Sequence, residues 1–189
     1  MTASEHGHAK VFVIDLPDSF ANKPTVPKPR VIVDQHTSHG LQPLSGNKLL
    51  FTQSSLRGPN NVFVADLKAD TISAITKFGR DELKDKHLDR GESFWFRGAD
   101  HHRQVQGWSI KPKGFDDSIN KGKKWPAVFL IHGGPQGAWE DGWSTRWNPN
   151  VFAQQGYWVI AVNPTGSTGF GQGGWSTVIS RIMLTLGPV

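Results

Sequence analysis

Two apolar runs late in the chain constrain its fold more than any other feature. The first, Ala-Val-Phe-Leu-Ile, covers residues 127–131, and the second, Tyr-Trp-Val-Ile-Ala-Val, covers residues 157–162. Uninterrupted apolar strands joined through a helix are typical of a buried parallel sheet. The segment between the runs carries an N-cap, a proline at the first helical position, an apolar face and a terminating glycine, which are Asn148, Pro149, Val151, Phe152 and Gly156. This order predicts an α/β unit.

The first apolar run leads directly into His132, Gly133, Gly134 and Pro135. Two adjacent glycines after a strand let the backbone approach a ligand closely and direct its N–H groups toward it. In α/β-hydrolases a loop of this composition helps to stabilise the oxyanion of acyl transfer. A serine within Gly-x-Ser-x-Gly, the nucleophile that such a site needs, occurs nowhere in the 189 residues. The sequence therefore indicates one wall of a hydrolase site without its attacking group.

A repeat of short strands occupies the first part of the chain. Val-Phe-Val-Ile-Asp-Leu at residues 11–16 recurs as Val-Phe-Val-Ala-Asp-Leu at residues 62–67, and a second strand-like stretch follows each copy, at 30–33 and 71–76. A repeat of this length built from short strands is typical of β-propeller blades. Two similar edge strands of an ordinary β-sandwich are the alternative interpretation.

A change of composition marks the best domain boundary. Residues 111–124 are rich in Lys, Gly, Asp and Asn, which is typical of a linker or an exposed loop. We therefore predict a mixed fold in which the C-terminal blades of a β-propeller, residues 1–110, precede this linker. The N-terminal part of an α/β-hydrolase domain, truncated, is predicted over residues 125–189.

Two further segments extend this division. A hairpin is predicted from residues 94–96 and 105–110, within the propeller part. The tail, residues 173–189, is atypical of the hydrolase domain, although apolar residues between Val178 and Leu184 have the spacing of a short amphipathic helix.

Composition excludes several classes of function. The net charge of +5 arises from 21 Lys and Arg against 16 Asp and Glu that are interspersed, so there is no basic face for nucleic acid. No window approaches the roughly 20 apolar residues of a membrane span, and the N-terminus lacks the apolar core of a signal peptide. We therefore expect neither a nucleic-acid partner nor a membrane partner.

Metal and cofactor sites are not expected either. His6 and His8 form one histidine pair and His101 and His102 another, but neither has the third ligand that a zinc site requires. We interpret all four as solvated loop histidines. The glycine-rich run after residue 163 lacks the Gly-Lys-Ser/Thr of a phosphate-binding loop.

Three segments, residues 105–112, 124–136 and 156–171, together resemble the prolyl oligopeptidase family of serine peptidases. Within it they are most similar to the fungal dipeptidyl-peptidase V and acylaminoacyl-peptidase branches. The resemblance implies a β-propeller that gates an α/β-hydrolase domain with a Ser-Asp-His triad. It also implies a secreted enzyme, acting on peptides, that releases dipeptides from their N-termini.

The resemblance transfers few site residues. Gly134 matches the position whose backbone N–H donates to the oxyanion, and Gly133 gives the turn its freedom. His132 lies where other branches carry a tyrosine, so it either orients this loop or is a plain histidine at a strand end. Thr165 replaces the family's usual arginine, which removes an ion pair expected there.

Ser167 is rejected as a nucleophile. A nucleophile elbow requires glycine two residues before the serine, where this chain has Thr165. His132 is also the last of the eight histidines, so the order Ser, Asp, His cannot be completed after Ser167.

We therefore predict a fragment of a serine-type dipeptidyl peptidase, inactive as this chain because all three triad residues are absent, and attribute the missing part to a truncated gene model. The full-length parent is expected to bind a peptide substrate and to need no cofactor. Two alternatives stay open. One is a non-catalytic β module that binds a peptide or a partner, and the other is a different α/β-hydrolase such as an esterase.

Overall fold

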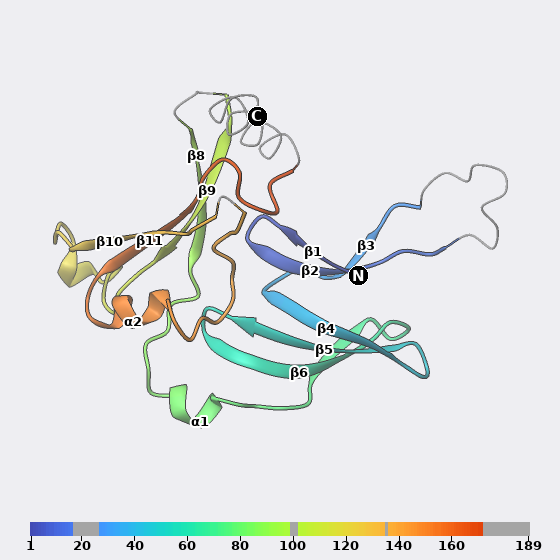
Figure 1. Ribbon diagram of the computed structural model, residues 1–189. Helices are drawn as coiled ribbons and strands as arrows, with labels where there is room; N and C mark the ends of the chain where they lie inside the picture. Colours follow the sequence, from blue (N-terminus) through green and yellow to red (C-terminus); the bar gives the residue numbers. More distant parts are fainter. Residues whose placement is uncertain (17–26, 99–101, 135, 172–189) are drawn as a thin grey trace.

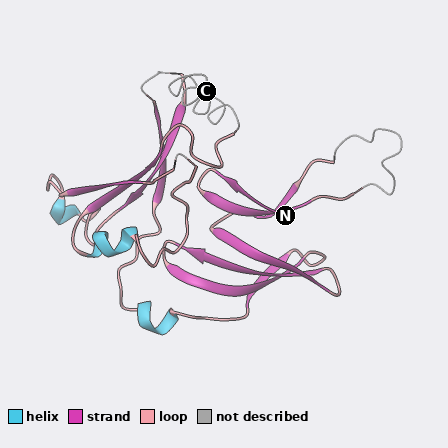
Figure 2. Ribbon diagram, viewed as in Figure 1, coloured by secondary structure: helices cyan, strands magenta, loops and turns pink. Residues whose placement is uncertain are grey.

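The computed structural model describes residues 1–16, 27–98, 102–134 and 136–171, and strands dominate them (Figures 1 and 2). They form a seven-stranded sheet and a four-stranded sheet. The larger sheet contains β1 (Thr2–Glu5), β2 (His8–Val13), β3 (Arg30–Val33), β4 (Thr37–Leu44), β5 (Lys48–Ser55), β6 (Gly58–Asp66) and β7 (Thr71–Ala74). The smaller sheet contains β8 (Glu92–Arg97), β9 (Gln104–Ile110), β10 (Ala127–Ile131) and β11 (Trp158–Asn163).

The repeated motif forms equivalent strands of the larger sheet. Its two copies lie in β2 and β6, and each pairs in antiparallel fashion with the strand that follows, β3 or β7. Strands β4 to β7 form an antiparallel meander, which a parallel contact between Ala9 and Thr37 connects to β2. Phe51 is 1% exposed and stacks on Phe63 at 5.7 Å. Val11 is also fully buried, so both parts of the sheet contribute to one core.

The predicted strand–helix–strand unit is confirmed in the smaller sheet, whose strand order is β10-β11-β9-β8. Strands β10 and β11 pair in parallel, with Ala127 opposite Trp158, and α2 (Pro149–Gln154) lies between them in sequence. The expected hairpin is also present as β8 and β9. Because β9 pairs with β11, this sheet takes strands from both sides of the predicted linker, residues 111–124, and thus from both predicted domains, residues 1–110 and 125–189.

Helix α2 begins and ends as predicted. The Asn148 side chain accepts a hydrogen bond from Asn150 N at 2.9 Å, Pro149 is the first helical residue, and Gly156 adopts a φ of 89° just after the helix. The predicted apolar face is wrong at Val151, which is 59% exposed, while Ala153 is buried against the sheet. A helix of six residues buries only a narrow stripe, and packing against β11 selects it.

The core of the smaller sheet includes a residue from the larger one. Trp108, Ile110 and Val159 pack with Leu56, which lies in the turn between β5 and β6. One face of β10 remains open, because Phe129 is 59% exposed. The prediction that this strand is buried therefore holds for only one of its two faces.

A single carboxylate ties the larger sheet to the loop after β10. Asp141 N donates to Gly7 O at 2.8 Å, while its side chain accepts from Leu56 N at 2.9 Å and contacts His36 Nδ1 at 2.6 Å. We call these four residues the Asp141 clamp. The interpretation of His8 as a solvated loop residue is wrong, because His8 belongs to β2, is half-buried and lies 3.9 Å from Asp141.

The remaining regular elements are short. They are α1 (Arg80–Leu83), which lies between β7 and β8, and a 3₁₀ turn, Ser118–Asn120, within the predicted linker. Among the described helices, none has the length and apolar character needed to cross a bilayer. His101 and the predicted tail helix near residues 178–184 lie outside the described residues.

Candidate oxyanion site

The glycine loop begins where β10 ends, and its backbone geometry depends on glycine. Gly134 has a φ of 144°, and a Cβ there would collide with the backbone nitrogen of Gln136. Gly133 and Gly134 are both exposed. Among the described residues, no acceptor takes the N–H of Gly134. Just beyond the carboxyl end of β10, the loop therefore carries a backbone donor without an acceptor among the described residues.

His132 links this loop to the turn that follows β11. Its Nε2 lies 2.8 Å from Ser167 Oγ, and its Nδ1 lies 2.9 Å from Gly133 O. Because a carbonyl oxygen only accepts, Nδ1 carries a proton in this contact. In a neutral ring Nε2 is then an acceptor for the Ser167 hydroxyl proton, for which Pro164 O competes at 2.7 Å. The imidazole thus bridges the glycine loop and the turn.

Ser167 lacks the setting of a nucleophile. It is 4% exposed and lies in a turn, where its amide donates to Pro164 O at 3.0 Å. Its hydroxyl proton has a second acceptor within reach, because Oγ lies 2.7 Å from Pro164 O. No carboxylate contacts His132 Nδ1 among the described residues, since Gly133 O occupies that position. The geometry suits a structural bridge better than a charge-stabilised Ser-His pair.

Asn163 fixes the end of β11 beside the same loop. It is 2% exposed. Its side-chain Nδ2 donates to Gln106 Oε1 at 2.6 Å and to Trp139 O at 2.9 Å, and its side-chain Oδ1 accepts from Trp139 N at 2.6 Å. Sequence reasoning missed this residue and the bridge between His132 and Ser167. The available signal for Asn163 was a polar residue directly after the apolar run 157–162.

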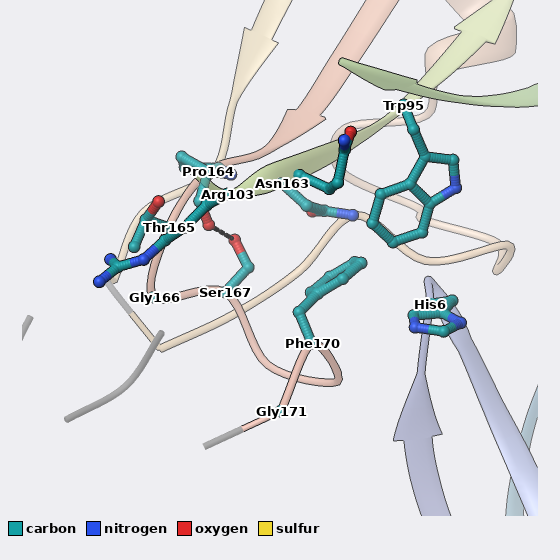
Figure 3. A pocket seen from close by; sticks show the side chains of 11 residues that line it. His6, Trp95, Arg103, Asn163, Pro164, Thr165, Gly166, Ser167, Phe170 and Gly171 are labelled. Carbon is teal, nitrogen blue, oxygen red and sulfur yellow. Dashed lines mark hydrogen bonds between the residues drawn. The ribbon is translucent and has the colours of Figure 1, made fainter. Parts of the chain in front are cut away.

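A cavity of about 360 Å³ lies beside this turn (Figure 3). Three aromatic rings contact one another on one side: His6 lies 5.2 Å from Trp95, and Trp95 lies 5.8 Å from Phe170. Ser167 and Asn163 line the other side, together with Thr165. The cavity lies between the first hairpin of the chain and residues of β8, β9 and β11 in the smaller sheet.

The described residues contain no cluster of three or more His, Cys, Asp or Glu able to hold a metal ion. His8 and His36 both lie beside the Asp141 carboxylate, away from this loop. The site around Gly134 consists of backbone donors, one imidazole and hydroxyl groups. Such groups bind and orient polar substrates through hydrogen bonds.

Comparison with known proteins identifies relatives of the chain. It is 42% identical over 147 residues to dipeptidyl-peptidase 5 of Aspergillus fumigatus, which covers 77% of this chain and 20% of that protein. Dipeptidyl-peptidase 5 of Trichophyton equinum is 40% identical over 179 residues, covering 91% of this chain and 22% of that protein. The chain thus spans about a fifth of the length of these relatives. No family model matches it.

Solved structures share its fold. Pyrococcus horikoshii acylaminoacyl peptidase superposes with a TM-score of 0.74 at 21% identity, over 95% of this chain and 25% of that one. Porphyromonas gingivalis dipeptidyl peptidase 4 gives a TM-score of 0.63 at 20% identity, over 89% of this chain and 22% of that one. The chain is therefore a homologue of the dipeptidyl-peptidase 5 proteins over most of its length, with a mixed, sheet-dominated fold similar to that of prolyl oligopeptidase-family peptidases.

Proposed function

We propose that this chain supplies the oxyanion-stabilising wall of a serine-type peptidase that releases dipeptides from peptide N-termini. The observation that carries the proposal is the N–H of the exposed Gly134 just after β10, which has no acceptor among the described residues, in a homologue of dipeptidyl-peptidase 5. Backbone N–H groups at fixed positions are the usual donors to the oxyanion of acyl transfer. Peptide carbonyls are the corresponding substrate groups.

The same proposal assigns the two sheets. The meander β4 to β7 is one blade of a β-propeller, because four antiparallel strands in sequence order are the unit of that fold. The parallel pair β10 and β11, with α2 between them, begins an α/β-hydrolase domain. The domain limits 1–110, 111–124 and 125–189 stay predictions. Secretion of the parent enzyme is part of the same proposal.

In the reaction, a serine attacks the peptide carbonyl while a histidine accepts its proton. Negative charge develops on the carbonyl oxygen, and Gly134 N–H donates to it. His132 is a positioning residue in this scheme, because its Nδ1 contacts Gly133 O and its Nε2 contacts Ser167. Because Gly133 O and Gly134 N–H belong to the same peptide unit, the imidazole limits rotation of the unit that carries the donor.

The 189 residues contain no serine in a Gly-x-Ser-x-Gly motif, and they contain no histidine after His132. We therefore expect no peptidase activity from these residues alone. Cleavage of a dipeptidyl substrate by the purified chain, abolished by a serine-directed inhibitor, would contradict this expectation. The donor itself is testable in a chimera. In it, the homologous segment of Aspergillus fumigatus dipeptidyl-peptidase 5 is replaced by this chain.

In the chimera, Gly134→Ala keeps the backbone N–H, but its Cβ would collide with Gln136 N and force the loop out of its conformation. We expect this displacement to lower kcat by up to about 10²–10³ with little change in KM, the range seen when one oxyanion donor is lost. Gly133→Ala is the matched control, because a Cβ at 133 meets no atom within 4 Å. Equal activity of the two variants would overturn the role of Gly134. His132→Gln is expected to lower kcat less than Gly134→Ala does, because it loosens the loop without introducing a clash at the donor residue.

A non-catalytic peptide-binding module is the second candidate function. The cavity with aromatic rings at His6, Trp95 and Phe170 favours it, because aromatic side chains bury large apolar areas of a ligand. Binding of a dipeptide to this chain, weakened by Trp95→Ala and unaffected by Gly134→Ala, would support this function.

A further inference from the structure

A second pocket, of about 240 Å³, lies on the larger sheet's side of Trp108 and does not include the glycine loop. It is bordered by the start of β2, the turn between β5 and β6, and the segment that leads into β8. We propose that this pocket binds a small oxyanion, a carboxylate or a phosphate, through Arg57 and Arg90. We call it the Arg57–Arg90 pocket.

The two arginines provide charge that is not neutralised. Both side chains are exposed and line the pocket. In the part of the chain that the structure describes, neither guanidinium forms an ion pair within 4.0 Å. A planar guanidinium matches carboxylate and phosphate oxygens with two parallel hydrogen bonds. Two of them at one pocket favour an anionic ligand over a neutral one.

The nearby carboxylates already have other partners. Asp89 accepts from Gly91 N at 2.7 Å and from Lys111 N at 2.9 Å, one bond to each oxygen. Glu92 pairs with Lys111 Nζ at 3.1 Å. Asp141 lines the pocket, but its two oxygens contact Leu56 N and His36 Nδ1. These contacts leave Arg57 and Arg90 available for an external anion.

The other polar groups of the pocket add donors. Ser55 Oγ accepts from Arg57 N at 3.1 Å, and Ser93 Oγ accepts from Gln106 Nε2 at 3.0 Å, so both hydroxyl protons can be donated. His8 Nδ1 accepts from His36 N at 3.1 Å, which leaves the proton of a neutral ring on Nε2. A pocket whose unused groups are mostly donors suits an acceptor-only ligand.

The volume limits the size of the ligand. Pockets that enclose drug-sized molecules begin at about 300 Å³, and this one is smaller and open to solvent. It fits a phosphate, or the terminal carboxylate of a peptide with its last residue. Because both arginines are exposed, binding is expected to weaken strongly as ionic strength rises.

The test titrates inorganic phosphate into the 189-residue chain at low salt and follows backbone amide signals by NMR. Signals of Arg57, Gly91 and Ser93 are expected to shift together. Arg57→Gln and Arg90→Gln are each expected to weaken binding by about tenfold, the loss of one charge-assisted contact. Arg30→Gln is the matched control, since Arg30 is exposed on β3 and outside the pocket.

Two further titrations distinguish the sources of the oxyanion. The first uses a tripeptide with a free C-terminal carboxylate, and the second uses the same tripeptide with an amidated C-terminus. If only the free carboxylate shifts the same signals and competes with phosphate, the ligand is a peptide carboxylate. Phosphate binding alone identifies a phosphate ligand, and either result supports the pocket. The proposal is overturned if neither ligand shifts these signals in the wild-type chain. This outcome does not depend on whether any of the variants folds. Equal weakening by Arg30→Gln would also overturn it.

Discussion

The Asp141 clamp permits a quantitative prediction about how the two sheets are held together. Asp141→Asn keeps the size of the side chain and an oxygen for Leu56 N, but it removes the charge that faces His36. The His36 contact is short, at 2.6 Å, yet the His36 side chain is 40% exposed, so solvent screens it. We therefore expect a loss of about 1 kcal/mol in the free energy of unfolding, below the usual range for a charged hydrogen bond.

Asp141→Ala should cost more, because it also removes the acceptor of a buried amide. Leu56 is 3% exposed, and its N–H would lose its partner at 2.9 Å. An unsatisfied buried donor costs about 1–3 kcal/mol, so the total loss is expected to be about 2–4 kcal/mol. The difference in the free energy of unfolding between Asp141→Ala and Asp141→Asn therefore measures the hydrogen bond from Leu56 N separately from the charge.

The pH dependence gives a sharper test. The hydrogen bond to Asp141 raises the pKa of His36 above 6.5, so its stabilisation is complete below that value and is lost as pH rises through the raised pKa. Burial lowers the pKa of His8, which destabilises the fold at acid pH, and Asp141 opposes that effect while Lys10 and His36 add to it. Asp141→Asn removes the carboxylate that favours the protonated form of both histidines. Its cost should therefore be larger at about pH 5.5 than at about pH 8.

Urea denaturation of the chain at both pH values measures these differences. Asp34→Asn is the matched control, because Asp34 is exposed and affects His8 only through charge. A cost of Asp141→Asn that is the same at both pH values, or no greater than that of Asp34→Asn, would refute the reasoning.

Three further substitutions test the site. Asn163→Ala should cost about 3 kcal/mol in urea denaturation, because Trp139 N and two other groups lose buried partners; a loss below about 1 kcal/mol would contradict the network. Ser167→Ala in the chimera should retain most of kcat, and complete inactivation would contradict its structural role. Gly169→Ala should destabilise more than Gly171→Ala: both have positive φ, but only at 169 would a Cβ approach the hairpin backbone, at 3.1 Å from Ser4 C. Equal costs in thermal unfolding would count against that docking contact.

Local signals in the sequence sufficed for several elements. Asn148 and Pro149 placed the start of α2, since capping depends on residues within one turn of the helix. The repeat located β2 and β6 but not their buried faces. Val11 is fully buried, whereas its counterpart Val62 is half-buried, because the two strands pack against different neighbours. A short sequence match fixes strand propensity and leaves burial to tertiary packing.

The contacts that assemble the site are beyond such local reasoning. His36 and Asp141 are 105 residues apart, and His132 and Ser167 are 35 apart. Each pair meets only because strands from different parts of the chain enter a common sheet or core. His8 illustrates the consequence. Its position beside a polar turn indicated a solvated residue, but the loop after β10 folds over it and provides Asp141.

The glycine loop is held through contacts with the first hairpin and with the turn after β11, and these contacts bear on the proposed role of Gly134 as a donor. Gly134 keeps a φ that favours glycine, while Thr168 N donates to Gly137 O at 3.0 Å a few residues later. The same turn is anchored to the first hairpin, where His6 N donates to Gly169 O at 3.0 Å. Asp141 attaches the other end of the loop to that hairpin through Gly7. Before Gly134, the contact between His132 and Ser167 holds the other flank of the loop. A backbone donor fixed in this way would not need to reorganise when charge develops opposite it, which is the physical requirement of the proposed oxyanion stabilisation.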